Sequence, residues 1–299
     1  MPSGLVLMIP GSEKPFAGSL GYGVDVDGMH HLCTRDGSPL PYTLHGAGHP
    51  LIFVSAYGMT AAEWPKRMLS PLADRYRLVL YDHRGISGCA NPAVPFSIPQ
   101  AAEDLHDLIA GIGEATATII GYSMGGMVAL EHAIRYPDEV DRLILLNAHC
   151  GGVEAVPSEE WVQEEMAGEP DSIDAYLDRA GRLLLTDSFR KMHPDPSLWF
   201  PDVGEPVDAA VVRQQFDALR SWSGVYPRLK DVRAKALVIF GDRDLVTPPD
   251  NAGILAMAIP DAGAIIMEDG GHGIIFQYPE EIAWMIREFL EQGDHPMGR

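Results

Sequence analysis

Six short, largely apolar runs recur along the chain, and amphipathic segments separate them. The runs are Leu51–Val54, Tyr76–Tyr81, Ala117–Ile120, Arg142–Leu146, Ala236–Phe240 and Ala264–Met267. Such runs are typical of strands covered on both faces, as in a parallel sheet. The segments Ile98–Gly111, Met124–Tyr136 and Pro279–Leu290 carry apolar residues at helical spacing. This alternation predicts an α/β fold, with a mostly parallel sheet flanked by helices.

The residues before the first run predict a hairpin. Pro41–Leu44 and Pro50–Val54 flank Gly46 and Gly48, and glycines between two apolar stretches are typical of a turn between antiparallel strands. Residues 1–30 contain several prolines and glycines, so we expect them to form an irregular N-terminal arm.

Residues 151–228 interrupt the alternation. They contain helical patterns and no strand run, so we expect a helical cap inserted into a core formed by residues 31–150 and 229–299. Ligands of open α/β sheets bind beyond the carboxyl ends of the strands, where this insertion begins. We therefore interpret the insertion as a lid whose aromatic side chains contact the substrate. These side chains are Trp161, Trp199, Phe200, Trp222 and Tyr226. The alternative is a helical lobe whose aromatic residues form only its own core.

Composition excludes several function classes. The 299 residues include 22 Lys and Arg against 42 Asp and Glu, a formal net charge of −20, which disfavours nucleic acid and anionic membranes as partners. No apolar stretch reaches the roughly 18 residues of a membrane span. The three cysteines, Cys33, Cys89 and Cys150, are far apart, which indicates a reducing compartment, and we interpret Cys89 as structural. We expect a cytoplasmic protein with no metal or other cofactor.

A Gly-x-Ser-x-Gly motif spans Gly121-Tyr122-Ser123-Met124-Gly125, after a predicted strand and at the start of a predicted helix. In this context the motif predicts a sharp turn that presents the serine hydroxyl at the edge of the sheet. The helix N-terminus beneath it favours negative charge. Side chains at Gly121 and Gly125 would collide with the neighbouring strand and helix. We therefore predict that Ser123 is a nucleophile.

A serine nucleophile requires a base to remove its proton. His272 follows the run Ala264–Met267 and precedes the last predicted helix, so it lies on a loop beyond a strand end, from which it can reach Ser123. His83 and His149 also follow strands, and we interpret them as structural. His272 is thus the predicted base.

The base in turn requires an acid to orient it and to stabilise its charged form. Asp242 and Asp244 both follow the run Ala236–Phe240. We favour Asp244 because it lies farther past the strand end, whereas Asp242 is closer and has Arg243 as a salt partner. Asn147 ends another strand, so that alternative position carries no acid.

These motifs together resemble the α/β-hydrolase superfamily, in the branch with a serine nucleophile and an inserted helical cap. The resemblance covers about residues 35–292. It rests on Gly121–Gly126, Tyr81-Asp-His-Arg-Gly85, Gly241–Asp244 with Pro248, and Gly270-Gly-His272. It implies a tetrahedral intermediate whose oxyanion is held by two backbone N–H groups.

The resemblance also implies where these N–H groups lie. One would belong to Met124, directly after the nucleophile. The other would come from the loop after Leu51–Val54, where the family usually has His-Gly and this chain has Ser55-Ala56-Tyr57-Gly58. On this basis Tyr57 supplies the second N–H, and its ring lines the substrate pocket.

We therefore predict a serine hydrolase that cleaves a carboxylic ester, lactone or thioester of a moderately large, apolar or aromatic small molecule. Two alternatives remain open: a carbon–carbon bond hydrolase or lyase on the same scaffold, and a ligand-binding protein that has kept the fold without turnover. The predicted partner is the small-molecule substrate, and the sequence leaves open whether the chain forms a homo-oligomer.

Overall fold

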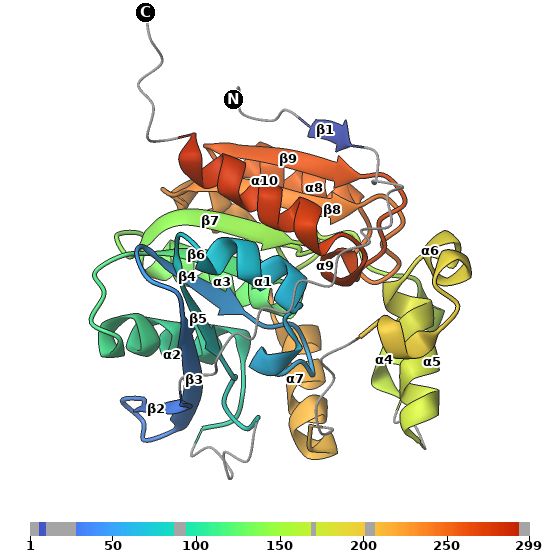
Figure 1. Cartoon of the computed structure of the whole chain (residues 1–299). Helices are drawn as coiled ribbons and strands as arrows, with labels where there is room; N and C mark the ends of the chain where they lie inside the picture. Colours follow the sequence, from blue (N-terminus) through green and yellow to red (C-terminus); the bar gives the residue numbers. More distant parts are fainter. Residues whose placement is uncertain (1–5, 10–27, 87–93, 169–171, 201–206, 293–299) are drawn as a thin grey trace, which may run out of the picture.

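The fold is built on one sheet whose strands come from nearly the whole chain. A computed structural model describes residues 6–9, 28–86, 94–168, 172–200 and 207–292. Within these ranges, nine strands follow the order β1-β9-β8-β7-β6-β4-β5-β3-β2. They are β1 (Val6–Ile9), β2 (His30–Cys33), β3 (Pro39–His45), β4 (Pro50–Val54), β5 (Arg77–Tyr81), β6 (Ala117–Tyr122), β7 (Val140–Leu146), β8 (Lys235–Gly241) and β9 (Ala262–Met267). Neighbours are parallel except β2–β3 and β3–β5, which confirms the predicted α/β fold (Figure 1).

Helices connect most of the strands. They are α1 (Lys66–Ala73), α2 (Ile98–Gly111), α3 (Met124–Arg135), α4 (Glu160–Ala167), α5 (Ile173–Leu184), α6 (Asp187–Met192), α7 (Ala209–Ser221), α8 (Asp250–Ala258), α9 (Ile274–Gln277) and α10 (Pro279–Glu291), with short 3-10 helices η1 (Ala61–Glu63), η2 (Pro196–Leu198) and η3 (Tyr226–Asp231). Helices α1 and α10 lie side by side, as do α2 and α3. In the part of the chain that is described, no helix is long and apolar enough to cross a membrane.

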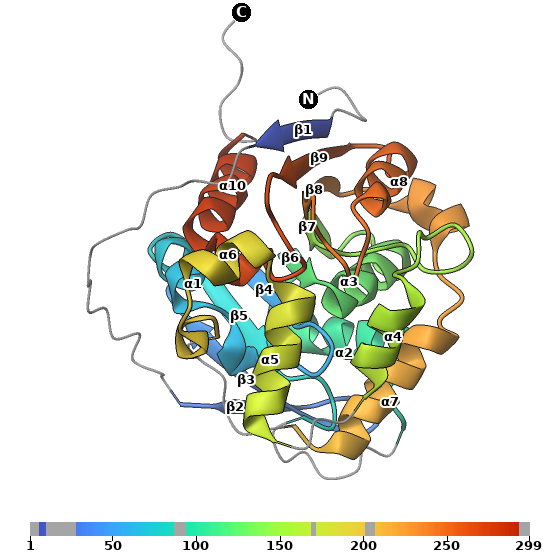
Figure 2. The same ribbon diagram turned by 90° about the vertical axis from the view of Figure 1, so that its right-hand side faces the viewer.

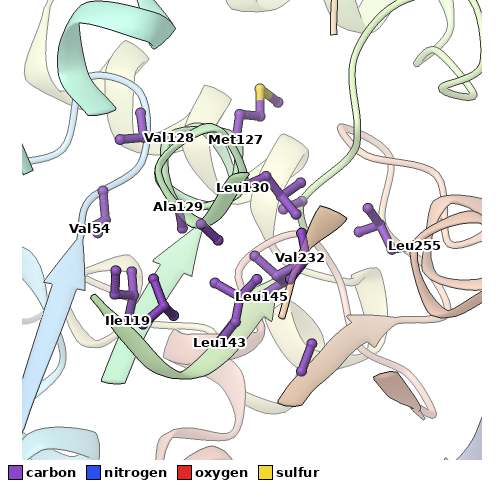
Figure 3. Close-up of a cluster of buried hydrophobic side chains, with 14 of the residues drawn as sticks. Val54, Ile119, Met127, Val128, Ala129, Leu130, Leu143, Leu145, Val232 and Leu255 are labelled. Atoms are coloured by element: carbon purple, nitrogen blue, oxygen red, sulfur yellow. The ribbon is translucent and has the colours of Figure 1, made fainter. Parts of the chain in front are cut away.

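The central strands divide their side chains between two hydrophobic cores, one on each face of the sheet. Ile52 and Val54 of β4 belong to the core that includes α2, α3 and α8, whereas Leu51 and Phe53 belong to the core that includes α1 and α10. Figure 3 shows part of the first core, where α3 packs on β6 and β7. Successive side chains of a strand point to opposite faces, so a strand covered on both faces is apolar at every position. This explains why the runs in the sequence are continuous.

The predicted hairpin between Pro41–Leu44 and Pro50–Val54 is wrong. β3 pairs antiparallel with β2 and β5, while β4 pairs in parallel with β5 and β6, so that β5 separates β3 from β4. The glycines between them instead allow the backbone to pass close to the backbone of residues 73–76. Gly46 has a φ of 74°, and a Cβ there would overlap the carbonyl oxygen of Ala73.

Strands β1 and β2 form where the sequence predicted no strand. β2 and β3 make a hairpin whose turn contains Asp36 and Gly37, the latter at a φ of 86°; Asp-Gly pairs are typical of such turns. β1 lies in the arm that we expected to be irregular and pairs in parallel with β9, with Val6 beside Ala264, at the edge of the sheet (Figure 1). Residues 1–5 and 10–27 of that arm lie outside the described residues.

The segment 151–228, hereafter the cap, joins β7 to β8 and holds α4, α5, α6 and α7. Its described residues contain no strand. In Figure 1, α4, α5 and α6 stand together on the side to which the arrowhead of β9 points, and Figure 2 views the molecule from that side. The cap elements therefore lie near the carboxyl ends of the parallel strands, where α/β proteins bind ligands.

Candidate active site

Ser123 lies in a strained turn between β6 and α3. Its φ of 53° and ψ of −117° fall outside the regions that residues with a Cβ usually adopt. Its N–H donates to the carbonyl oxygen of Leu146 on β7 at 2.8 Å, which ties the turn to the sheet. A Cβ at Gly125 would overlap the carbonyl oxygen of Val54, and a Cβ at Gly121 would lie 2.5 Å from the carbonyl oxygen of Gly125. Close backbone packing therefore requires both glycines of the motif.

His272 lies between Ser123 and Asp244. Its Nε2 is 2.9 Å from Ser123 Oγ, and its Nδ1 is 2.8 Å from Asp244 Oδ2. All three residues are at most 8% exposed. Because an ionised carboxylate only accepts hydrogen bonds, Nδ1 carries the proton and the lone pair of Nε2 faces the serine hydroxyl. An imidazole held in this way can take the proton of the serine.

Of the two carboxylates that the sequence offered, Asp244 is the one in contact with His272. Its Oδ1 accepts hydrogen bonds from the N–H groups of Val246 and Thr247, at 2.8 and 2.7 Å, and its Oδ2 remains for the histidine. Asp242 instead pairs with Arg243, with 3.6 Å between Oδ2 and Nε. The turn after β8 thus orients Asp244 through its own backbone.

The backbone of the histidine loop is anchored by β6 and β7. The Tyr122 hydroxyl donates to the carbonyl oxygen of His272 at 3.0 Å. The side-chain amide of Asn147 donates to the same oxygen at 2.6 Å and to the carbonyl oxygen of Gly271 at 3.1 Å, and its Oδ1 accepts from the N–H of Gly241 at 3.1 Å. These contacts hold the loop that carries the base against two neighbouring strands.

Asn147 is a residue whose role the sequence analysis missed. The sequence marked its position only as one without an acid, yet the side chain is fully buried and links β7, β8 and the histidine loop. Its φ of 48° lies in the left-handed region, which asparagine tolerates better than most residues. The available signal was a polar amide placed directly after an apolar strand.

The predicted oxyanion donors, Tyr57 and Met124, follow β4 and β6. Among the hydrogen bonds of the described residues, neither backbone N–H has a protein acceptor. The next N–H along the loop, that of Gly58, is occupied, since it donates to Oε1 of Gln215 on α7 at 2.8 Å. The N–H of Tyr57 therefore remains available for a ligand, whereas that of Gly58 does not.

Ser55, the first residue after β4, is held from two sides. Its carbonyl oxygen lies 3.0 Å from Nε2 of His83, and its hydroxyl accepts a hydrogen bond from Nε1 of Trp64 at 3.0 Å. Burial lowers the pKa of His83 to about 4. His83 is therefore a neutral hydrogen-bond donor at pH 7.

His149 lies after β7, close enough to His272 for their charges to interact. Burial above all, and then the neighbouring His272, lower the pKa of His149 to about 4. Its Nδ1 accepts a hydrogen bond from the N–H of Gly151 at 3.0 Å, which places its proton on Nε2. Like His83, it is neutral at pH 7.

The aromatic residues predicted to contact substrate occupy different environments. Trp199 and Phe200 are buried in a small cluster that joins the cap to Phe276 of α9, and the Trp199 indole N–H donates to the carbonyl oxygen of His193. Half-buried Trp222 packs against the core around α3. These contacts give the three side chains a packing role.

The two remaining cap aromatics are partly exposed to solvent. Trp161 is 44% exposed and Tyr226 is 39% exposed. The ring that meets Tyr57 is instead that of Phe216 on α7, with 6.0 Å between ring centroids. Phe216 was not singled out from the sequence, where it is one apolar position of an amphipathic helix.

Among the described residues, this site holds no cluster of potential metal ligands. No group of three or more His, Cys, Asp or Glu side chains in the described ranges could hold a metal ion. Burial raises the pKa of the Cys150 thiol to about 11, and Cys33 is exposed. Cys89 lies outside the described residues.

The fold and the site together define a class: α/β proteins with a serine on a strained strand–helix turn, facing a histidine that contacts a carboxylate. A model of the alpha/beta hydrolase family matches residues 43–283, and the chain belongs to this family of hydrolases.

Individual relatives are distant in sequence. The chain is 26% identical to proline iminopeptidase PfmaB of Pestalotiopsis fici over 290 residues, covering 90% of this chain and 99% of that protein. An enol-lactonase from Burkholderia xenovorans superposes with a TM-score of 0.75 at 23% identity, covering 87% of this chain and 99% of that one. A meta-cleavage product hydrolase (CumD) from Pseudomonas fluorescens has a TM-score of 0.74 at 20% identity, covering 88% and 98%. These two structures share the fold.

Proposed function

We propose that this protein is a serine hydrolase that cleaves a carboxylic ester, lactone or thioester of a moderately large, apolar or aromatic small molecule. The observation that carries the proposal is the pair of contacts made by His272, at 2.9 Å to Ser123 Oγ and 2.8 Å to Asp244 Oδ2. A serine hydroxyl becomes nucleophilic only when such a base removes its proton.

In the proposed reaction, Oγ of Ser123 attacks the substrate carbonyl while Nε2 of His272 takes the hydroxyl proton. Asp244 stabilises the resulting imidazolium through Nδ1–H. The N–H groups of Met124 and Tyr57 hold the oxyanion of the tetrahedral intermediate, each contributing a few kcal/mol, about 3, to lowering the barrier. His272 then gives its proton to the departing oxygen or sulfur, which leaves an acyl-enzyme.

Water completes the cycle by the same route. His272 removes a proton from water as the water oxygen attacks the acyl carbonyl, and it returns that proton to Oγ of Ser123 as the acid departs. The net change is hydrolysis of one acyl bond, and no redox group or metal takes part in any of these steps.

The aromatic side chains at the proposed oxyanion loop support an apolar or aromatic substrate. The rings of Tyr57 and Phe216 meet beside the proposed oxyanion loop, and rings of this kind provide large contact areas for apolar ligands. The net charge of −20 disfavours the approach of anionic substrates. We further propose that the cap restricts access to this site and that the small-molecule substrate is the partner of the chain.

A fluorophosphonate, which labels activated serines, tests the proposal. Intact mass should increase by one adduct per chain in the wild type and stay unchanged in Ser123→Ala. A panel of esters, lactones, thioesters and diketones then identifies the bond: both reactions release an acid, but acyl hydrolysis also frees an alcohol or thiol group, whereas carbon–carbon bond cleavage frees a ketone or enol. Absence of an adduct on folded wild-type protein would contradict the mechanism.

A further inference from the structure

Gln215 is a buried polar residue that reaches from the cap to the core. It lies on α7 and is fully buried, and its Oε1 accepts a hydrogen bond from the N–H of Gly58 at 2.8 Å. Its Nε2 is buried without a hydrogen-bond partner among the described residues. An unpaired buried amide group costs about 1–3 kcal/mol. A glutamine at this position is therefore poorly explained by stability, and the one bond that it makes ends on the loop beside the nucleophile.

The same loop meets the cap at further points. The Tyr57 hydroxyl donates to the carbonyl oxygen of Met166 on α4 at 3.2 Å, and its ring contacts Phe216. A Cβ at Gly58 would lie 3.9 Å from the methyl groups of Val212 on α7. Two cap helices thus surround the Tyr57–Gly58 segment, and Gln215 supplies a hydrogen bond to its backbone.

This hydrogen bond decides which N–H groups of the loop are available. The peptide group between Tyr57 and Gly58 carries the N–H of Gly58 and the carbonyl group of Tyr57, so the hydrogen bond from that N–H to Gln215 fixes the orientation of this peptide group. Gly58 has a φ of 66°, in the left-handed region that glycine adopts readily. Its N–H is held by Gln215, and the N–H of Tyr57 is left for the oxyanion.

We infer that Gln215 is a positioning residue for the oxyanion hole, through which cap helix α7 orients the Tyr57–Gly58 segment. The inference rests on the proposed function. Gln215 does not touch the reacting atoms; it acts by holding Gly58, so the geometry of the oxyanion site depends on α7 being packed against this loop. The cap then contributes to the rate of the reaction as well as to the shape of the pocket.

The test replaces Gln215 by leucine, which keeps much of the volume and removes the acceptor. Gln214→Leu is the matched control, because Gln214 is the exposed neighbour on the same helix. With an ester identified from the panel, Gln215→Leu should lower kcat by about 10- to 100-fold and leave KM within about threefold. Binding of a trifluoromethyl ketone, whose adduct with Ser123 places an oxyanion in the hole, should weaken by the same factor as kcat/KM.

Several outcomes separate this inference from its alternatives. Gln215→Met, an unbranched replacement of similar length, should reproduce the effect and serves if the leucine variant does not fold. A kcat equal to the wild type in either folded variant, with normal fluorophosphonate labelling, would overturn the role of Gln215 and leave the proposed function intact. An equal loss in Gln214→Leu would overturn it as well. If the wild type is not labelled, the proposed function fails and the inference fails with it.

Discussion

Replacing Asn147 by aspartate tests how the histidine loop is held, because the two side chains have the same shape and differ in their donors. In the wild type, Nδ2 of Asn147 donates to the carbonyl oxygens of His272 and Gly271, at 2.6 and 3.1 Å. In Asn147→Asp, a carboxylate oxygen would face both carbonyl oxygens in a fully buried environment. The substitution thus converts two attractive contacts into repulsive ones without a change of volume.

The size of the effect follows from which groups lose their partners. The carbonyl oxygen of His272 keeps the Tyr122 hydroxyl as a donor at 3.0 Å, whereas that of Gly271 loses the donor it has. One unpaired buried carbonyl costs about 1–3 kcal/mol, and burial of the new carboxylate adds about as much again. We expect Asn147→Asp to lower the free energy of unfolding by about 3–5 kcal/mol. We expect kcat to fall by about 10- to 100-fold, because a displaced loop misplaces the base.

Urea unfolding at pH 7, followed by circular dichroism, measures the first quantity, and steady-state hydrolysis of the identified ester measures the second. Asn147→Gly is the control: glycine adopts the φ of 48° without strain and removes the hydrogen bonds without adding a charge. Its loss should be smaller than that of Asn147→Asp. The anchoring argument is refuted if the free energy of unfolding of Asn147→Asp is within about 0.5 kcal/mol of the wild-type value and its kcat is within about twofold of the wild-type kcat.

Two further predictions concern the strained turn that carries Ser123 and the buried histidines. Gly125→Ala should lower the free energy of unfolding by more than about 3 kcal/mol, because its Cβ would overlap the carbonyl oxygen of Val54. Gly253→Ala in α8, where a Cβ would meet nothing within 4 Å, should raise it by about 0.5–1 kcal/mol; equal melting temperatures of the two variants would contradict this. Burial lowers the pKa of His83 and of His132 to about 4, from an ordinary 6.5, so the unfolded chain binds more protons between these values. The contribution of the neutral histidines to the free energy of unfolding should be fully present above about pH 6.5 and should be lost as the pH falls to about 4. Urea unfolding across this range should show a shallower decline of the free energy of unfolding in His83→Gln than in the wild type. A wild-type free energy that does not change with pH would contradict the lowered pKa values of these histidines.

Much of the fold is determined by local properties of the sequence. The apolar runs predicted the six central parallel strands, since a strand between two helical layers is apolar on both faces. The range predicted for α2, Ile98–Gly111, is the one observed, because Ser97 caps its N-terminus and Pro99 lies in its first turn. Ser123 and His272 could be selected for the same reason: each follows a strand run in a glycine-rich turn, and that context lies within a few consecutive residues.

Other features were decided only when distant segments packed together. The insertion of β5 between β3 and β4, and the pairing of β1 with β9, depend on partners that no local pattern reveals. The sequence favoured Asp244 over Asp242, but the contact itself depends on how the turn after β8 packs beside the loop that carries His272. Phe216, and not the tryptophans of the cap, meets Tyr57 because of how α7 is seated on the core.

Two polar contacts of this site show why the sequence alone did not reveal them. Asn147 and His272 are 125 positions apart in the sequence, and Gln215 and Gly58 are 157 positions apart. Periodicity and turn chemistry report on the residues within one element, and they specify which elements form. Hydrogen bonds between side chains and remote backbone groups form only when the two elements are placed to within a few tenths of an ångström. Only the packing of the completed layers sets that placement.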